Sequence, residues 1–352
     1  MQKTSTLGEI SQAHQGKVSD KWSSYLEEYQ RLFCEYQNRP VSLLEIGIQN
    51  GGSLEIWGKY FANARTLTGC DINEKCRNLK FEDPRIAVVV GDANSDPVQG
   101  EILERSADFD LIIDDGSHTS GDIVKSFARY FPRLNAGGIF LAEDLHCSYW
   151  RDFEGGLFDP LSSVSFFKNL ADIVNHEHWG IREKRTDLLE PFRAAYGFDF
   201  AESDLAQIRS VEFLNSICVV RKCESGGGGL GVRRLAGTSA EVFVPTEPGT
   251  GSGPMNRVPD ESANIWSQAA QFQARSAAGD TAKEILDLKA GIARLEGEKD
   301  GIRVESDRLA FELGQANRRI DKLSHTLTLR DSSISWKLTA PLRALQNAIF
   351  RR

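Results

Sequence analysis

From Val41 onward the sequence alternates short apolar runs with amphipathic stretches. The runs are rich in Ile, Leu and Val, and in order they are VSLLEIGI, LTGCDI, IAVVVGD, DLIIDDG and GGIFLAED. Between them lie segments with helical periodicity, such as SLEIWGKYF and DIVKSFARYF. Buried strands that alternate with amphipathic helices are typical of a parallel sheet with helices on both faces. We therefore expect an α/β fold with a Rossmann-like, doubly wound, mostly parallel sheet.

Two more apolar runs, IRSVEFL and ICVVRKC, are separated only by Asn215 and Ser216. This spacing predicts a terminal antiparallel hairpin, which brings the sheet to seven strands. Residues 148–206 lie between the fifth run and the hairpin and are helical in pattern and rich in aromatic residues. An α/β fold can place a lid over its crevice at this point. We expect residues 41–223 to form the α/β domain, with an N-terminal helical segment at 1–40.

The composition changes after Cys223. Residues 224–264 are rich in Gly, Ser, Thr and Pro and lack apolar periodicity, which predicts a flexible linker. Residues 265–330 carry a heptad pattern that predicts a coiled coil, and through it a homo-oligomer. The alternative is one long amphipathic helix packed on the globular domain. The seam of the heptads is Ile285, Leu288, Ile292, Leu295, Lys299, Ile302, Ser306, Leu309, Leu313, Ala316, Ile320, Leu323 and Leu327.

The last segment, residues 331–352, is basic and amphipathic in the stretch SWKLTAPLRALQNAIFRR. It could lie on an anionic membrane surface or dock on a protein, such as a component of a glycan-assembly system. The formal net charge of −8 argues against a nucleic-acid partner. No apolar run is long enough to span a bilayer, and the six cysteines are scattered, which indicates reduced thiols. We expect a cytoplasmic protein. The basic tail is also compatible with a peripheral location at the inner face of the membrane.

The first strand ends in the turn LLEIGIQNGGS. It supplies Glu45, Gly47 and Gly51, and Ser53 begins the next helix. Glycines let a ligand approach the backbone closely, and a helix N-terminus offers N–H donors. Gln49 stands where the middle glycine of a dinucleotide fingerprint would be. The turn therefore indicates a nucleotide-type crevice that differs from the usual dinucleotide site.

Acidic residues also close the second and third strands, Asp71 in LTGCDI and Asp92 in VVVGDAN. A carboxylate at such a position can accept hydrogen bonds from ribose hydroxyls, although each acid could instead cap a helix. Acids at three successive strand ends would repel a pyrophosphate. They favour S-adenosylmethionine as the cofactor over a nicotinamide dinucleotide.

The fourth and fifth strands both end in pairs of acids, Asp114 and Asp115 in LIIDDGSH and Glu143 and Asp144 in LAEDLH. If these strands are neighbours, the carboxylates converge and repel one another unless a cation or a proton intervenes. An all-oxygen set suits Mg²⁺ better than zinc. His118 could take a proton from a metal-bound hydroxyl, and the alternative is a residue near a helix N-terminus without a chemical role. For His146, a few residues further on, a positioning or core role is favoured.

The stretches LLEIGIQNGGSLEIW, IIDDGSH and EDLHCSYW resemble the metal-dependent sugar O-methyltransferases of macrolide tailoring, and the wider group labelled cephalosporin hydroxylase. The resemblance covers residues 14–223, and upstream GKVSDKWSSYLEEY is similar to a helix that precedes the sheet in that family and lies near its active site. The resemblance implies that the second acid of DDGSH and both acids of EDLH hold Mg²⁺ and that the histidine is the general base. Carried over, the metal residues are Asp115, Glu143 and Asp144, the catalytic residues are His118 and Asp115, and the residues around S-adenosylmethionine are Glu45, Gly47, Gly51, Ser53, Asp71, Asp92 and Asp114.

The tail SWKLTAPLRAL is similar to C-terminal segments of bacterial glycosyltransferases and surface-polysaccharide proteins. We therefore expect a methyltransferase that acts on a sugar hydroxyl of a surface glycan. One alternative is tailoring of a glycosylated secondary metabolite. Another is a non-catalytic scaffold with a methyltransferase-like fold. Hydroxylation by the same metal pocket is a minor alternative, because the set of two histidines and one carboxylate expected of non-haem iron is absent.

Overall fold

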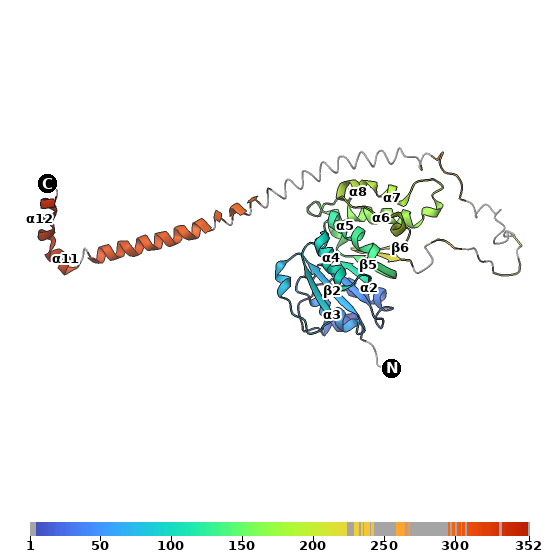
Figure 1. The fold of residues 1–352 in the computed structure, drawn as a ribbon, viewed down its shortest axis with the longest axis horizontal. Coiled ribbons are helices and arrows are strands. Elements are labelled where there is room, and N and C mark those ends of the chain that lie inside the picture. Colours follow the sequence, from blue (N-terminus) through green and yellow to red (C-terminus); the bar gives the residue numbers. More distant parts are fainter. Residues whose placement is uncertain are drawn as a thin grey trace. The chain divides into compact units, whose positions relative to one another are not determined.

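The structure is a computed structural model. It describes residues 5–223 and, beyond them, residues 229–231, 234, 236–239, 241–242, 258–264, 267, 295, 298–299, 301–303, 305–306, 308–330 and 333–350. The chain divides into two units, Met1–Lys283 and Glu284–Arg352, which are described separately below. Figure 1 shows the fold coloured along the sequence.

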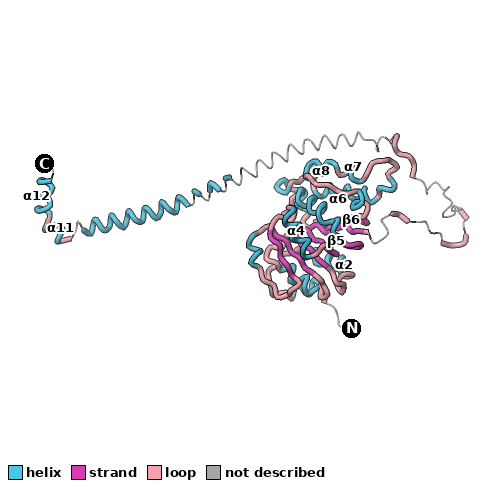
Figure 2. Tube along the Cα trace, in the orientation of Figure 1, coloured by secondary structure: helices cyan, strands magenta, loops and turns pink. Residues whose placement is uncertain are grey.

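The first unit is built on one seven-stranded sheet with the order β3-β2-β1-β4-β5-β7-β6 (Figures 1 and 2). Five strands pair in parallel, and β7 runs antiparallel to both β5 and β6. The predicted parallel sheet and terminal hairpin are both confirmed. The strands are β1 (Ser42–Ile46), β2 (Thr66–Asp71), β3 (Ile86–Val90), β4 (Phe109–Asp114), β5 (Leu134–Ala142), β6 (Ile208–Leu214) and β7 (Ile217–Lys222).

Helices precede the sheet, connect its parallel strands and form the insert before β6. The helical pattern expected after β2 is a short 3₁₀ helix, η1, rather than an α-helix. The elements of this unit are α1 (Leu7–Gln12), α2 (Ser23–Phe33), α3 (Gly52–Tyr60), η1 (Glu74–Asn78), α4 (Asp96–Arg105), α5 (Ser120–Tyr130), η2 (Phe131–Arg133), η3 (Leu145–Tyr149), η4 (Arg151–Phe153), α6 (Ser163–Val174), η5 (His176–His178), α7 (Arg185–Leu188), α8 (Glu190–Tyr196) and α9 (Glu202–Leu205).

The two faces of the sheet bury alternate residues of each strand, as the pleat requires. On one face Leu43, Ile113 and Leu141 belong to a core shared with α1, α2 and α3. On the other face the ring of Phe140 lies 5.1 Å from that of Phe127 in α5. Because the central strands β1 and β4 are covered on both sides, they are rich in apolar residues, which is why the sequence pattern identified them.

The helical insert expected at residues 148–206 has a core of its own aromatic side chains. Phe166 of α6 lies 5.5 Å from Phe127 of α5 and 5.3 Å from Phe192 of α8, measured between ring centroids. These three rings are almost completely buried. The insert is therefore fixed to α5 by packing, and its role as a lid stays a prediction.

In the second unit, residues 308–330 are helical, and α11 (Ile334–Leu338) and α12 (Ala340–Phe350) follow. The seam residues within the described part are exposed, among them Ile302 at 71%, Leu313 at 63% and Leu323 at 64%. An apolar stripe left open on a single chain is what a coiled coil would bury. The coiled-coil oligomer stays a prediction. The first heptads and most of the predicted linker lie outside the described residues.

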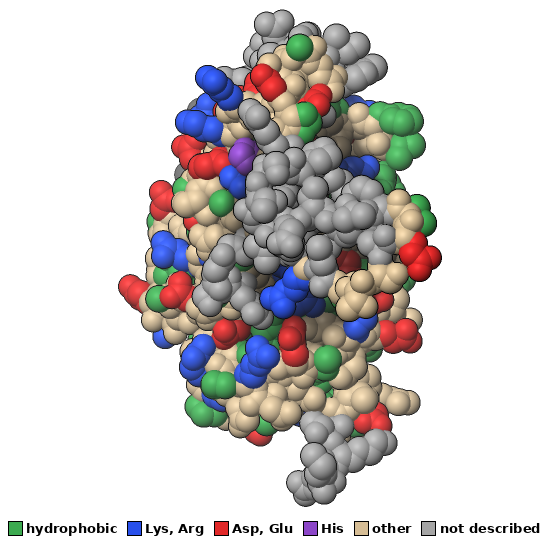
Figure 3. Space-filling model, turned by 90° about the vertical axis from the view of Figure 1, so that its right-hand side faces the viewer, with side chains coloured by type: hydrophobic (Ala, Val, Ile, Leu, Met, Phe, Trp, Pro, Cys, Tyr) green, Lys and Arg blue, Asp and Glu red, His purple; other side chains and the backbone are tan. Residues whose placement is uncertain are grey.

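The described helices include none that is long and apolar enough to cross a membrane. On the face of the molecule shown in Figure 3, the visible basic and acidic side chains are interspersed, without a continuous basic area. Nucleic-acid-binding proteins carry basic residues gathered on one face, and the expectation that nucleic acid is not a partner stays a prediction.

Candidate active site

The glycine-rich turn after β1 is held by the carboxylate of Asp71. Its Oδ2 accepts hydrogen bonds from the backbone N–H groups of Ile48 and Gln49, at 3.0 and 2.8 Å. Gly47 has φ +86°, and a side chain there would collide with the backbone of Asp115. The turn thus requires glycine at this position, and its shape depends on the acid at the end of β2.

A cavity of about 240 Å³, here called the glycine-turn cavity, opens at the carboxyl ends of β1, β2, β3 and β4. Ligands of open α/β sheets bind at this edge. The acid expected after the third strand lines it, as does the acid that ends β4. The predicted cofactor residues among its walls are Gly47, Asp71, Asp92 and Asp114.

Other residues assigned to the cofactor lie elsewhere. Glu45 is completely buried, and its Oε2 accepts hydrogen bonds from Ser53 Oγ at 2.7 Å and from Trp57 Nε1 at 3.2 Å. Glu45, Ser53 and Gly51 are not among the described residues that line the glycine-turn cavity. In this structure Glu45 and Ser53 connect β1 to α3, and a direct contact with a cofactor stays a prediction.

The acids that end β4 and β5 converge, as expected for neighbouring strands. The backbone ladder continues past the strand ends, because Asp115 N donates to Ile46 O and Glu143 N donates to Asp114 O. Strand alternation places Asp115 and Glu143 on the same face as Ile113 and Leu141, which is the face covered by the N-terminal helices. Asp114 points to the opposite face, towards α5.

A second cavity of about 250 Å³, here called the carboxylate cavity, lies beside the first. Its walls include the predicted metal and base residues, and it shares Gln49 and Asp115 with the glycine-turn cavity. Ligand atoms of Asp115, His118 and Asp144 lie within 4.8 Å of one another. The walls are Asp20, Lys21, Trp22, Tyr25, Gln49, Asp115, His118, Glu143 and Asp144.

Asp144 is held in place by side chains from the N-terminal segment. Its Oδ1 accepts hydrogen bonds from Tyr25 OH at 2.7 Å and from Trp22 Nε1 at 3.3 Å. Its Oδ2 lies 3.7 Å from His118 Nε2. One oxygen is therefore used for positioning, and the other faces the histidine and the cavity.

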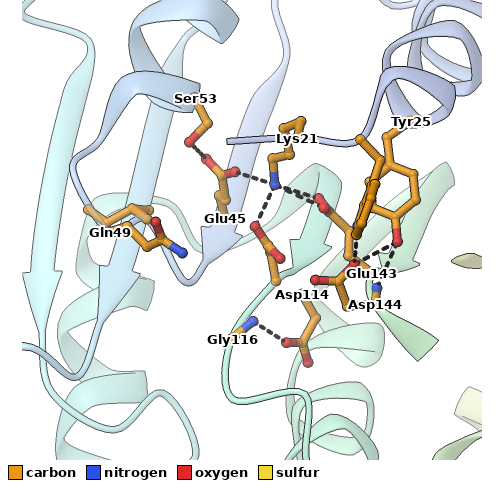
Figure 4. Close-up of polar contacts among 12 residues, drawn as sticks. Lys21, Tyr25, Glu45, Gln49, Ser53, Asp114, Gly116, Glu143 and Asp144 are labelled. Atoms are coloured by element: carbon orange, nitrogen blue, oxygen red, sulfur yellow. Dashed lines mark hydrogen bonds and ion pairs between the residues drawn. The ribbon is translucent and has the colours of Figure 1, made fainter. Parts of the chain in front are cut away.

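Lys21 is the residue of this cluster that the sequence did not identify. Its Nζ donates to Glu143 Oε1 and Oε2 at 2.8 and 2.9 Å and to Asp115 at 2.5 Å, and it lies 3.6 Å from Glu45 Oε1 (Figure 4). The stretch DKW that contains it suggested only a helix near the active site. An isolated lysine has no periodicity or spacing that would connect it to acids about a hundred residues away.

The pKa values of the cluster follow from burial and from Lys21. Burial raises the pKa of Asp114 to about 7, and it raises those of Glu143 and Asp115 to about 7 and about 6 against the attraction of Lys21. Burial alone would lower the pKa of Lys21, but the attraction of the three carboxylates outweighs it and raises that pKa. Burial lowers the pKa of His118, which favours a neutral imidazole at neutral pH.

The backbone is strained around the carboxylate cavity. Five non-glycine residues in the described part of the chain have positive φ, and three of them, Gln49, His118 and Asp144, line this cavity. Such conformations cost roughly 1–3 kcal/mol each and cluster at functional sites, where surrounding structure enforces them. His118 is thus aimed into the cavity by an unusual turn rather than by a helix.

Aromatic rings form an arc at the edge of the cavity. Ring centroids are 6.3 Å apart for Trp22 and His146, 5.0 Å for His146 and Trp150, 6.0 Å for Trp150 and Phe153, and 6.4 Å for Phe153 and His118. The two tryptophans are 61% and 51% exposed. The positioning role expected for His146 agrees with its place between them, and its Nδ1 contacts Ser216 Oγ.

The donor set fits a hard divalent cation. Four carboxylates and an imidazole surround the carboxylate cavity, and oxygen ligands are those that Mg²⁺ prefers. Of the described residues that line it, Lys21 is the one lysine or arginine, so the negative charge exceeds the positive charge. The predicted metal ligands Asp115, Glu143 and Asp144 all line this cavity, with Glu143 paired to Lys21 in this structure, and their role as ligands stays a prediction.

No protein-family model matches the chain. It is 33% identical over 227 residues to the 8-demethyl-8-alpha-L-rhamnosyl tetracenomycin-C 2'-O-methyltransferase of Streptomyces olivaceus, covering 62% of this chain and 55% of that protein. It is 36% identical over 188 residues to demethylmacrocin O-methyltransferase of Streptomyces fradiae, covering 49% of this chain and 46% of that protein. The chain therefore spans about half the length of the curated relatives it matches.

Solved structures of similar proteins are also methyltransferases. The chain is similar to the MycE methyltransferase from the mycinamycin biosynthetic pathway in complex with Mg, SAH and mycinamycin VI, with a TM-score of 0.53 and 26% identity. The match covers 65% of this chain and 56% of that protein. A second structure of the same enzyme, with Mg and SAH, gives a TM-score of 0.51 at 25% identity. The relatives are thus O-methyltransferases, and their fold is that of the first unit.

Proposed function

We propose that this chain is an S-adenosylmethionine-dependent, Mg²⁺-assisted O-methyltransferase that acts on a sugar hydroxyl. The observation that carries the proposal is the pair of adjoining cavities that share Gln49 and Asp115. One has the glycine turn and strand-end acids suited to a nucleoside donor, and the other has the acids and histidine suited to an alcohol. A methyl group would have to travel only between neighbouring cavities.

The chain's own residues account for most of the chemistry. Asp71 would keep the glycine turn in shape for the donor, and Asp115, Glu143 and Asp144 would hold the metal. When bound, Mg²⁺ would lower the pKa of a coordinated hydroxyl. His118, neutral because burial lowers its pKa, would accept the hydroxyl proton at Nε2.

Asp144 would then stabilise the charged imidazolium, since its Oδ2 lies 3.7 Å from His118 Nε2. The oxygen of the acceptor would attack the methyl carbon of the sulfonium, and the bond from that carbon to sulfur would break. Holding the two reactants in line can supply roughly 7–11 kcal/mol of the barrier reduction. The strained turns at Gln49, His118 and Asp144 support this positioning role, because they fix the cavity walls.

The acceptor would lie against the aromatic arc. Trp22 lines the cavity that contains His118, and Trp150 follows it in the arc beyond His146. Both rings are exposed, and aromatic rings provide a flat apolar surface that loses little conformational entropy on binding. A sugar ring presents an apolar C–H face to such a surface while its hydroxyls reach the polar residues. The arc therefore supports a cyclic, partly apolar acceptor.

The relatives favour a sugar carried by a small natural product, since one is named for a rhamnosyl tetracenomycin and the MycE complex contains mycinamycin VI. A surface polysaccharide as acceptor rests on the tail sequence alone. No relative reported above is named for a polysaccharide pathway. Of the two acceptor classes, a glycosylated secondary metabolite is thus better supported than a surface polysaccharide.

Calorimetric titration with S-adenosylmethionine tests the donor assignment. The wild-type protein should bind it saturably, and Asp71→Ala should weaken binding roughly 10-fold or more, because a charged acceptor of two backbone hydrogen bonds contributes about 1.5–3 kcal/mol. Glu74→Ala, in the exposed η1 helix that follows the same strand, is the matched control and should bind normally. A folded wild-type protein that gives no binding would favour the scaffold alternative.

A further inference from the structure

Lys21 occupies the centre of the acidic cluster. Its side chain is 9% exposed, and it is surrounded by three carboxylates whose oxygens lie within 4 Å of Nζ. Figure 4 shows the ammonium between Glu45 and Glu143, reaching in from the segment that precedes α2. Both oxygens of Glu143 accept hydrogen bonds from it.

The segment that carries Lys21 is attached at both ends. On one side Lys17 binds Glu55 of α3 through its backbone N–H, at 2.8 Å, and its ammonium, at 2.6 Å. On the other side Tyr25 donates to Asp144. The lysine is therefore delivered to the carboxylates by a short segment between two fixed points, unlike a surface lysine that finds an acid by chance.

Lys21 changes which atoms are available to a metal. Both oxygens of Glu143 and Oδ2 of Asp115 are bonded to the ammonium, and the ligand atoms that lie grouped within 4.8 Å are those of Asp115, His118 and Asp144. A divalent ion that used Glu143 as well would lie close to the ammonium. Two cations cannot share so small a buried space without strong repulsion.

We propose that the Lys21 ammonium and a divalent metal ion are alternative occupants of the space between Asp115 and Glu143, so that metal binding displaces Lys21 from Glu143. The inference rests on the metal site of the proposed function. Lys21 keeps the carboxylates neutralised in the metal-free protein. It thereby weakens metal binding and couples it to the position of residues 17–25.

The test measures binding of Mn²⁺ and Mg²⁺ alone, without donor or acceptor. Free Mn²⁺ is followed by electron paramagnetic resonance, and Mg²⁺ by its competition with Mn²⁺. Lys21→Met should bind both ions at least 10-fold more tightly than the wild type. Lys75→Met, which removes an exposed ammonium of η1 outside the carboxylate cavity and outside residues 17–25, should bind them as the wild type does.

Equal or weaker binding by Lys21→Met would overturn the inference and leave the metal site standing. If neither protein binds either ion, the metal site itself is wrong and the inference falls with it. Lys21→Gln serves if the methionine variant does not fold. Hydrogen exchange on the wild type is independent of any variant: Mg²⁺ should speed exchange at residues 17–25, and unchanged exchange with saturating Mg²⁺ would contradict the displacement.

Discussion

Asp114 provides a direct test of the electrostatics of this site. It is 3% exposed, and only one of its oxygens has a defined backbone donor, Gly116 N at 3.2 Å. Burial raises its pKa from 3.8 to about 7. Between these two values the folded protein keeps the proton while the unfolded chain has lost it. The contribution of Asp114 to stability therefore falls as the pH rises towards 7, and it levels off above about pH 8.

The size of the effect follows from the shift. At 1.36 kcal/mol per pKa unit, the cost of Asp114 grows by about 2.5 kcal/mol between pH 5 and pH 8. Asp114→Asn removes this titration and keeps an oxygen for Gly116 N. The stability of the variant relative to the wild type should therefore increase by about 2.5 kcal/mol over that range, which is about 5–10 °C in Tm for a domain of this size.

The assay is thermal unfolding of both proteins at pH 5 and pH 8, in EDTA and without S-adenosylmethionine. Asp108→Asn is the matched control, because Asp108 is an exposed acid directly before the same strand. Its Tm difference from the wild type should not change with pH. A Tm difference for Asp114→Asn that is the same at both pH values would refute the assignment of a buried, readily protonated carboxyl to this position.

Two further variants test the catalytic and acceptor assignments. His118→Ala should lower kcat by roughly 10²–10⁴-fold while SAH binds as before, as expected for loss of a general base. Unchanged kcat would reduce His118 to a structural role. The control is His178→Ala, at an exposed position of the insert. Trp150→Ala should raise KM for the glycoside acceptor roughly 2- to 10-fold with little change in donor affinity, because one aromatic contact contributes about 0.5–1.5 kcal/mol. The same change in Phe213→Ala, an exposed ring on the edge strand β6, would show that the arc has no special part in binding.

The fold could be predicted because its signals are local. Parallel strands buried on both faces appear as apolar runs, and their shared edge brings the acids after β4 and β5 together. The sequence alone therefore predicts that Asp115, His118 and Asp144 lie near one another. The pairing of β4 with β5 is the structural fact on which that expectation depended.

The parts of the site that could not be predicted depend on the direction in which a side chain points and on contacts between residues far apart in the sequence. Glu45 shares a sheet face with Leu43, so its side chain points towards Ser53 and Trp57 and not into the glycine-turn cavity. Counting residues along β1 would have given this result, but only once the covering helices were assigned to a face. The contact of Lys21 with Glu143 joins residues 122 positions apart and has no sequence signal.

The central claim is that the acids of β4 and β5 hold a divalent ion beside the donor. The most direct measurement is the anomalous difference map of crystals grown with Mn²⁺ and SAH, from the wild type and from Asp115→Asn. The account predicts a wild-type peak about 2.0–2.6 Å from oxygens of Asp115, Glu143 and Asp144, and its loss in the variant. A wild-type map with SAH bound but without a peak between these carboxylates would contradict it.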